Sequence, residues 1–316
     1  MSQHARIWAV LVTVYVLWGS TYLGIAVAGE TIPPLFAAST RFIVAGGLMA
    51  AIVKLRGGSL RVSRRAFATC VLVGCLLPGA NGILFFAERN VPTGLASLLI
   101  ASVPLWVVVM RVTMRERLGW QVTTGVALGF AGVAVLAQPS GGAKLWGIGL
   151  CVLSSVMWAG GSVISARGTM PADAFVATAY EMLAGGFVML VPSVLTVHHF
   201  SPSAGSIGGW VYLVTFGSLV GYTAYAWLLA NAPLGLVSTY AYVNPIVAIA
   251  LGVLFRGEHL SWRLLIGAIV VVAAVAAVVR QDPATAPASD EIPMASETDV
   301  VRLDRDAAEL ASRRSA

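Results

Sequence analysis

Two charged side chains, Arg41 and Glu181, lie well inside apolar stretches of this 316-residue chain. At about 1.5 Å per helical residue, each would lie roughly 12 Å from the end of a helix. Charged groups in such places are costly, and they usually pair with one another or take part in function. The two residues could form a buried ion pair that fixes helix packing. Alternatively, Glu181 could bind and release a proton, because removal from water favours the neutral form of a carboxyl group.

Aromatic and small polar residues form a second group of candidates. Tyr240, Tyr242 and Asn244 stand in an apolar segment and could hydrogen-bond or stack on a bound molecule. They could equally join membrane helices, since Tyr, Ser and Asn also serve in helix packing. Trp18 and Trp158 occupy matching places in two apolar segments. They could flank part of a ligand, anchor helix packing, or lie at the headgroup level, where Trp is enriched. The complete set of candidate cavity residues is Trp18, Ser20, Thr21, Asn81, Ser97, Trp158, Ser162, Tyr222, Tyr225, Ser238, Tyr240, Tyr242 and Asn244.

Position within the apolar segments distinguishes interior from interfacial residues. Asn81 lies well inside its segment, which favours a cavity. Tyr22 and Trp227 lie nearer segment ends, which favours the membrane interface. Glu88 and Arg89 lie at a predicted helix end, where we expect them to reach water.

The segments that carry these candidates belong to an internal repeat. Five residues recur at one constant offset: Pro92, Gly94, Leu95, Ser97 and Pro104 correspond to Pro233, Gly235, Leu236, Ser238 and Pro245. With a slip of one residue, Glu116, Leu118, Trp120 and Gly125 correspond to Glu258, Leu260, Trp262 and Gly267. We expect Pro104 and Pro245 to kink their helices, as gate hinges or as fixed bends. Such repeats are typical of secondary transporters, whose binding site lies between the halves.

Composition places the repeat in a membrane. Apolar residues make up 58% of the chain and charged residues 11%, against roughly half and one quarter in soluble domains. The net charge of +6 does not indicate nucleic-acid binding, because Lys and Arg cluster between the apolar runs. Cys70, Cys75 and Cys151 lie in apolar stretches without metal-ligand or disulfide spacing, which indicates small core residues.

Ten segments are apolar and long enough to cross a bilayer, which takes about 20 residues. They cover residues 7–27, 33–54, 67–86, 92–111, 118–137, 145–166, 174–196, 209–230, 233–255 and 262–280. We therefore predict an all-α polytopic membrane protein with ten transmembrane helices.

The distribution of positive charge predicts the orientation. With the N-terminus inside, eleven Lys and Arg residues face the cytoplasm and four face outward, as the positive-inside rule favours. Both halves, 1–140 and 141–280, contain five helices, so the second must enter the membrane inverted. Residues 281–316 are rich in Ala, Ser, Pro and acidic groups, which predicts a disordered cytoplasmic tail.

An enzyme and a channel are the alternatives from other classes. No histidine lies inside a predicted span, which leaves none there for a metal or for catalysis. Lys54 and Lys144 lie at helix ends, which removes a Schiff-base site. No GxxxxGK[ST] motif indicates ATP binding, and no ring of like charges indicates an ion pore. We expect no catalytic residues, no cofactor and no metal.

Several stretches, in their order and spacing, carry a family resemblance. They are WGSTYLGI at 18–25, PPLFAASTRFIVAGG at 33–47, NVPTGLASLLIASVPLW at 90–106, YEMLAGG at 180–186 and STYAYVNPIVAIALG at 238–252. Over residues 7–280 the chain resembles the EamA family of the drug/metabolite transporter superfamily, in particular bacterial inner-membrane exporters of the YedA type.

The resemblance implies two inverted five-helix EamA repeats around a central substrate cavity. It also implies alternating access and, in most such proteins, export of amino acids or other small metabolites from the bacterial cytoplasm. The expected partners are a small-molecule substrate and the lipid bilayer, without nucleic acid or ATP. A homodimer is left open. Both termini are expected in the cytoplasm.

Overall fold

Helices account for all regular structure in the part of the chain that the structure describes. A computed structural model describes residues 2–116, 119–136, 143–196, 201–232, 237 and 239–281. The helices are α1 (Gln3–Ala28), α2 (Pro34–Leu55), α3 (Arg64–Ala87), α4 (Thr93–Ile100), α5 (Val103–Thr113), α6 (Trp120–Leu136), α7 (Leu145–Arg167), α8 (Ala174–Thr196), α9 (Ala204–Tyr212), the π-helical η1 (Leu213–Val220), α10 (Gly221–Asn231), α12 (Tyr240–Arg256) and α13 (Trp262–Gln281).

The predicted membrane segments coincide with these helices. Within the described ranges, seven helices or continuous helical stretches are long and apolar enough to cross a membrane, and α4 and α5 together form one of them. The other predicted segments correspond to shorter apolar helices at Trp120–Leu136, Val243–Arg256 and Leu264–Ala277. The all-helical class is confirmed, whereas the count of ten crossings stays a prediction. The predicted boundary at residue 140 and the tail from 282 onward lie outside the described residues.

Local sequence explains where several helices begin and break. Ser2, Ser63 and Ser203 accept hydrogen bonds from backbone N–H groups in the first turns of α1, α3 and α9, which satisfies donors that a helix start leaves free. Pro104 stands at the start of α5, directly after the break that separates α5 from α4. Pro245 lies inside α12, which continues through it. The two prolines therefore differ in effect although their positions correspond.

Glycines bring α2, α3 and α8 into close contact. A Cβ atom added at Gly74 of α3 would lie 2.3 Å from the carbonyl oxygen of Glu181 in α8. One added at Gly185 of α8 would lie 2.2 Å from the carbonyl oxygen of Gly74. No real Cβ atom fits at these distances, so the close approach of the two backbones requires glycine at both positions. Small residues serve the same purpose in many membrane helix pairs.

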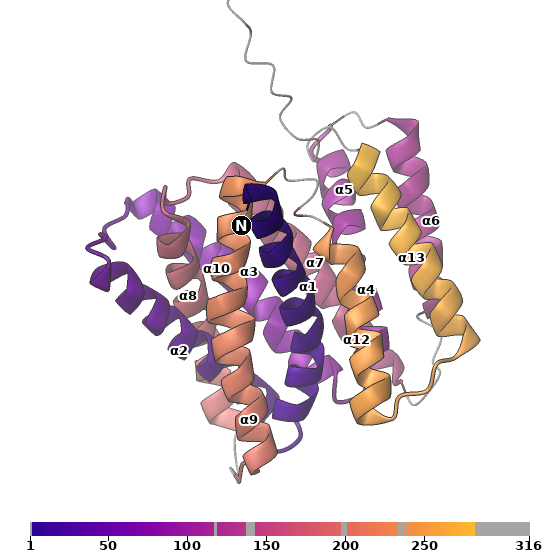
Figure 1. The fold of residues 1–316 in the computed structure, drawn as a ribbon, viewed down its shortest axis with the longest axis horizontal. Helices are drawn as coiled ribbons and strands as arrows, with labels where there is room; N and C mark the ends of the chain where they lie inside the picture. The colour runs from indigo at the N-terminus through magenta and orange to yellow at the C-terminus, as the bar shows by residue number, and fades with distance from the viewer. Residues whose placement is uncertain are drawn as a thin grey trace, which may run out of the picture.

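Several helices of each half pack against helices of the other half. α2 packs against α8, and α6 against α13, so these pairs join equivalent helices. α1 packs against α12 and α10, while its counterpart α7 packs against α4, α5 and α3. Figure 1 shows α2 and α8 at the left, α6 and α13 at the right, and the remaining helices between them. The start of α1 and the end of α13 both lie at the top of this view.

Candidate functional site

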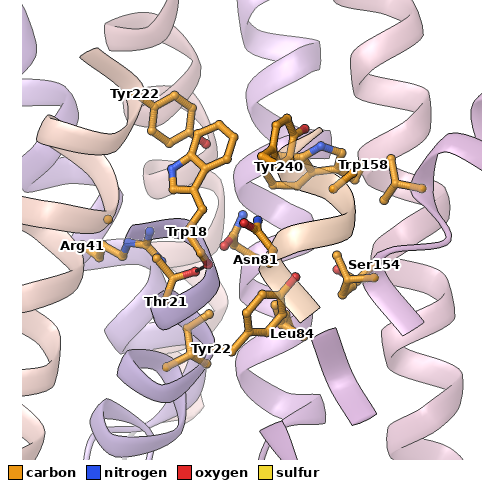
Figure 2. Close-up of a pocket in the computed structure, with 16 residues that line it drawn as sticks. Trp18, Thr21, Tyr22, Arg41, Asn81, Leu84, Ser154, Trp158, Tyr222 and Tyr240 are labelled. Carbon is orange, nitrogen blue, oxygen red and sulfur yellow. Dashed lines mark hydrogen bonds between the residues drawn. The ribbon is translucent and has the colours of Figure 1, made fainter. Parts of the chain in front are cut away.

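A cavity of about 110 Å³ lies among the central helices. Its walls come from α1, α2, α3, the junction of α4 and α5, α7, η1, α10 and α12. Figure 2 shows Trp18 and Tyr222 beside each other near Arg41, with Trp158 and Ser154 on the opposite side. The lining residues are Trp18, Thr21, Tyr22, Ile25, Arg41, Asn81, Leu84, Ile100, Val103, Ser154, Trp158, Gly217, Tyr222, Tyr240, Ala241 and Asn244.

Equivalent positions of the two halves meet at this cavity. Trp18 and Trp158 stand at matching places in the first helix of each half, and both line it. Three further pairs share the offset of the repeated prolines: Asn81 with Tyr222, Ile100 with Ala241, and Val103 with Asn244. The cavity therefore lies between the repeats. The second half contributes a Tyr and an Asn where the first has an Asn and a Val, so the cavity is chemically unequal on its two sides.

One wall of the cavity is aromatic. The Trp18 ring centroid lies 5.6 Å from that of Tyr222, 4.9 Å from that of Tyr225 and 5.0 Å from that of Tyr240. Tyr225 and Tyr240 also meet edge to face, with centroids 5.8 Å apart. Contacts at these distances and tilts are favourable between aromatic rings. The cluster holds the Trp18 indole in place and offers an apolar surface to a bound molecule.

Arg41, which lines this cavity, has an unpartnered donor. The residue is 3% exposed. Its Nε donates to the Ser218 Oγ of η1 at 3.1 Å, and the guanidinium carbon lies 4.8 Å from the ring centroid of Phe42. Its Nη1 is buried and has no hydrogen-bond partner. A buried donor without a partner costs about 1–3 kcal/mol, and more when it is charged. The free edge of the guanidinium is therefore suited to an anionic group.

Asn244 has an unpartnered acceptor, which complements the Arg41 donor. This α12 residue is 8% exposed, and its Oδ1 is buried without a hydrogen-bond partner. Asn81 of α3 also lines the cavity, and its Nδ2 donates to the carbonyl oxygen of Leu77 at 3.3 Å. The Asn81 side-chain oxygen has no protein donor among the described contacts. Together the two amides place acceptor groups in the same cavity as the Arg41 donor.

Four of the residues selected from sequence lie away from the cavity. The Ser97 and Ser162 hydroxyls donate to the carbonyl oxygens of Gly94 and Trp158 in their own helices, a common use of Ser in membrane spans. Ser20 bonds to the Tyr212 hydroxyl on another side of α1. Tyr225 lies behind Trp18 in the aromatic cluster. Ser238 and the side chain of Tyr242 lie outside the described residues.

Arg41 and Glu181 form no ion pair in this conformation. In the described part of the chain, ion pairs join Arg111 and Arg167 to Glu116, and Arg256 to Glu30. Arg41 instead turns toward η1 and the cavity, whereas half-buried Glu181 of α8 is not part of the cavity wall. A proton-carrying role for Glu181 stays a prediction.

Two expectations from position along the chain are wrong. Tyr22 is 8% exposed and lines the cavity, because it shares an inward face of α1 with Trp18 and Ile25. Glu88 does not reach water as expected, since it is 9% exposed and neither carboxylate oxygen has a hydrogen-bond partner. Spacing from Trp18 could have identified Tyr22. Burial of Glu88 depends on helices distant in sequence, which the chain around it does not reveal.

The sequence is similar to those of several membrane transporters. The model of the EamA-like transporter family matches the chain twice, over residues 6–138 and 145–280. The "Uncharacterized inner membrane transporter YedA" of Escherichia coli (strain K12) is 37% identical over 268 residues, which cover 82% of this chain and 86% of that protein. The "Probable terminal-alkyne amino-acid exporter" of Streptantibioticus cattleyicolor is 26% identical over 269 residues, covering 82% and 88% of the two chains.

A solved crystal structure has the same fold. It superposes with a TM-score of 0.62 at 21% sequence identity, and the match covers 86% of this chain and 96% of the other. The double match of the family model, the identity to an inner membrane transporter and the cavity between the two repeats agree with one another. The chain belongs to the EamA-like transporter family.

Proposed function

We propose that this protein is a secondary transporter that exports amino acids or similar small metabolites by alternating access. One observation carries the proposal: Arg41 and Asn244 line the cavity between the repeats, and a donor of the one, Nη1, and an acceptor of the other, Oδ1, are buried without a hydrogen-bond partner. An amino acid carries the complementary groups, a carboxylate and an ammonium.

Each part of such a substrate has a matching surface. The carboxylate fits the free edge of the Arg41 guanidinium, since charge-assisted hydrogen bonds of this kind are among the strongest in proteins. The ammonium fits Asn244, and the substrate side chain fits the aromatic wall at Trp18. The cavity of about 110 Å³ is smaller than the roughly 300–1,000 Å³ of common ligand pockets. The substrate is therefore small, or the cavity widens when it opens.

Alternating access follows from the repeat. Equivalent helices surround the cavity, so exchanging their arrangements would open it to the opposite side of the membrane. Orientation is part of the proposal: both termini face the cytoplasm and ten helices cross between them. Reporter fusions after residue 140 should then read periplasmic, and fusions at residue 60 or at the C-terminus cytoplasmic. The reverse pattern would contradict the orientation.

Transport by purified protein in liposomes tests the function. A carrier should show saturable uptake and should exchange labelled for unlabelled amino acid. Asn244→Ala should raise KM about tenfold, the effect of losing roughly 1.4 kcal/mol of binding. Ser162→Ala is the matched control, because its hydroxyl bonds to its own helix away from the cavity. Equal KM values for both variants and the wild type would remove Asn244 from the binding site.

The same measurement separates the other classes. A channel would pass the solute at rates that barely saturate and would show no counter-exchange. An enzyme would return a chemically altered product. The names of the relatives agree with a carrier.

A further inference from the structure

Glu88 is a buried acid that does not line the central cavity. It follows α3 directly and is 9% exposed, with both carboxylate oxygens buried and unpartnered. An ionised carboxylate that has lost water without gaining a hydrogen bond costs several kcal/mol. The protonated form avoids this cost. The surroundings of Glu88 therefore favour a bound proton.

The groups around Glu88 strengthen this preference. Burial raises the pKa of Glu88 well above its ordinary value of 4.5, the nearby Glu258 raises it further, and Arg256 acts in the opposite direction. Arg256 is also engaged elsewhere, because its Nη1 donates to Glu30 Oε1 at 2.7 Å. The titratable and charged groups facing or adjoining Glu88 are Tyr22 of α1, Glu30 after α1, Arg89 beside it, Cys151 of α7, Arg256 of α12 and Glu258 after α12.

The neighbouring Glu258 is held in place by two backbone hydrogen bonds. Its Oε1 accepts from the backbone N–H of Thr93 at 2.6 Å, and its Oε2 accepts from that of Gly94 at 3.0 Å. Backbone donors at a helix start attract a carboxylate and fix its position. A second negative charge at Glu88 is correspondingly unfavourable.

A second cavity connects Glu88 with the end of the molecule. It measures about 180 Å³ and is lined by Glu88 together with Glu30 and Arg256, whose side chains are 52% and 33% exposed. Ile25 lines both this cavity and the central one. Glu88 thus borders a cavity that reaches exposed residues, with its carboxylate oxygens covered in this conformation, and Ile25 is shared between that cavity and the proposed substrate site. In the proposed orientation this end faces the periplasm.

The second half has no acid at the position equivalent to Glu88. With the offset of the repeated prolines, Glu88 corresponds to Leu229. An apolar residue therefore suffices at the equivalent place in the repeat. This asymmetry separates Glu88 from the features that both halves share, such as the prolines and the glycines.

We propose that Glu88 is the proton-binding residue that couples export to the proton gradient. The inference rests on the proposed transport function. Glu88 takes a proton from periplasmic water through the outer cavity. When the transporter opens inward, the proton leaves toward the cytoplasm as substrate binds, and one proton enters for each substrate exported.

Stability against pH tests the bound proton without any substrate. A native carboxyl with a raised pKa binds more protons than the unfolded chain above pH 4.5, so its contribution to stability is lost as pH rises. In detergent, the melting temperature of the full chain should fall from about pH 5 to about pH 8. Glu88→Gln and Glu88→Leu should reduce this slope and melt higher than wild type at the upper pH. Glu30→Gln, in the same cavity but exposed, should keep the slope. Parallel profiles for wild type and both Glu88 variants would overturn the proposal.

Transport against a pH gradient tests the coupling. Glu88→Gln should lose gradient-driven stimulation and keep counter-exchange at the wild-type rate, because exchange moves no net proton. Glu181→Gln should retain both. Loss of stimulation in Glu181→Gln alone would assign coupling to Glu181 and refute our proposal. Absence of any amino-acid transport by the wild type would contradict the proposed function instead, and the stability profiles would still decide whether Glu88 holds a proton.

Discussion

The turns that follow α5 and α12 each place a left-handed residue directly before a glutamate, but the two glutamates make different contacts. Arg115 and Gly257 occupy equivalent places in the repeat, and both adopt the left-handed conformation, with φ of 64° and 63°. The next residue is a glutamate in each case. Glu258 accepts two backbone hydrogen bonds at the start of α4. Glu116 instead accepts from Arg111 Nε at 2.6 Å and pairs with Arg167, whose side chain is 46% exposed.

A single position accounts for much of this difference. A Cβ atom on Gly252 of α12 would lie 2.6 Å from Glu258 Oε2, so glycine makes room for the carboxylate. With the offset of the repeated prolines, the corresponding residue in the first half is Arg111, whose guanidinium donates to Glu116. Corresponding turns thus produce a half-buried helix cap in one half and a partly exposed ion pair in the other.

Of the variants that test this comparison, Glu258→Ala should lower the free energy of unfolding most. It leaves the N–H groups of Thr93 and Gly94 without their acceptor, and Thr93 is only 2% exposed. We expect a loss of about 3 kcal/mol in unfolding free energy, seen as a lower melting temperature in detergent. Glu116→Ala is the matched control and should cost much less. Equal losses would show that the two glutamates contribute alike.

Gly252→Ala should cause the second-largest loss of stability, because the new methyl group displaces the Glu258 carboxylate. We expect a loss of about 1–2 kcal/mol from this crowding. The loss should largely disappear in the Glu258→Ala background, which a double-mutant cycle measures. Gly149→Ala in α7 is the control, since a Cβ atom there meets nothing within 4 Å. A full loss in both backgrounds would mean that the methyl group clashes with something else.

Substitutions at the two residues with left-handed backbone should change stability in opposite directions. Gly257→Ala should cost about 1 kcal/mol, because a side chain disfavours positive φ. Arg115→Gly should stabilise by about 0.5 kcal/mol, since relief at positive φ exceeds the entropy cost of glycine. Melting temperatures of both variants provide the measurement. The same sign for both would indicate that the Arg115 side chain makes contacts that outweigh its backbone strain.

Glu116→Gln should have the smallest effect. Exposed ion pairs contribute about 0–1 kcal/mol, and salt screens them. We expect the small difference from wild type to vanish at high ionic strength, whereas the effect of Glu258→Gln should persist. A salt-independent loss in Glu116→Gln would indicate a buried role for this residue as well.

Sequence alone determined the helical class, the repeat and the residues with the chemistry to bind a substrate. Apolar segments of membrane length and a motif repeated at a constant offset are local properties of the chain, and the helices follow them because a bilayer requires internal backbone hydrogen bonding. Trp18 and Trp158 could be paired from the repeat, and both line the cavity.

Tertiary structure decided which of those residues face the cavity and which charges meet. Ser97 and Ser162 resemble Asn81 and Asn244 as polar groups in apolar segments, yet their hydroxyls bond to their own helices. The Arg41 side chain donates a hydrogen bond to Ser218, which is distant in sequence, and does not pair with Glu181. Glu88 became buried through neighbours on α1, α7 and α12. The rotation of each helix about its axis depends on the packing of distant helices, and the periodicity of a uniformly apolar segment does not encode it.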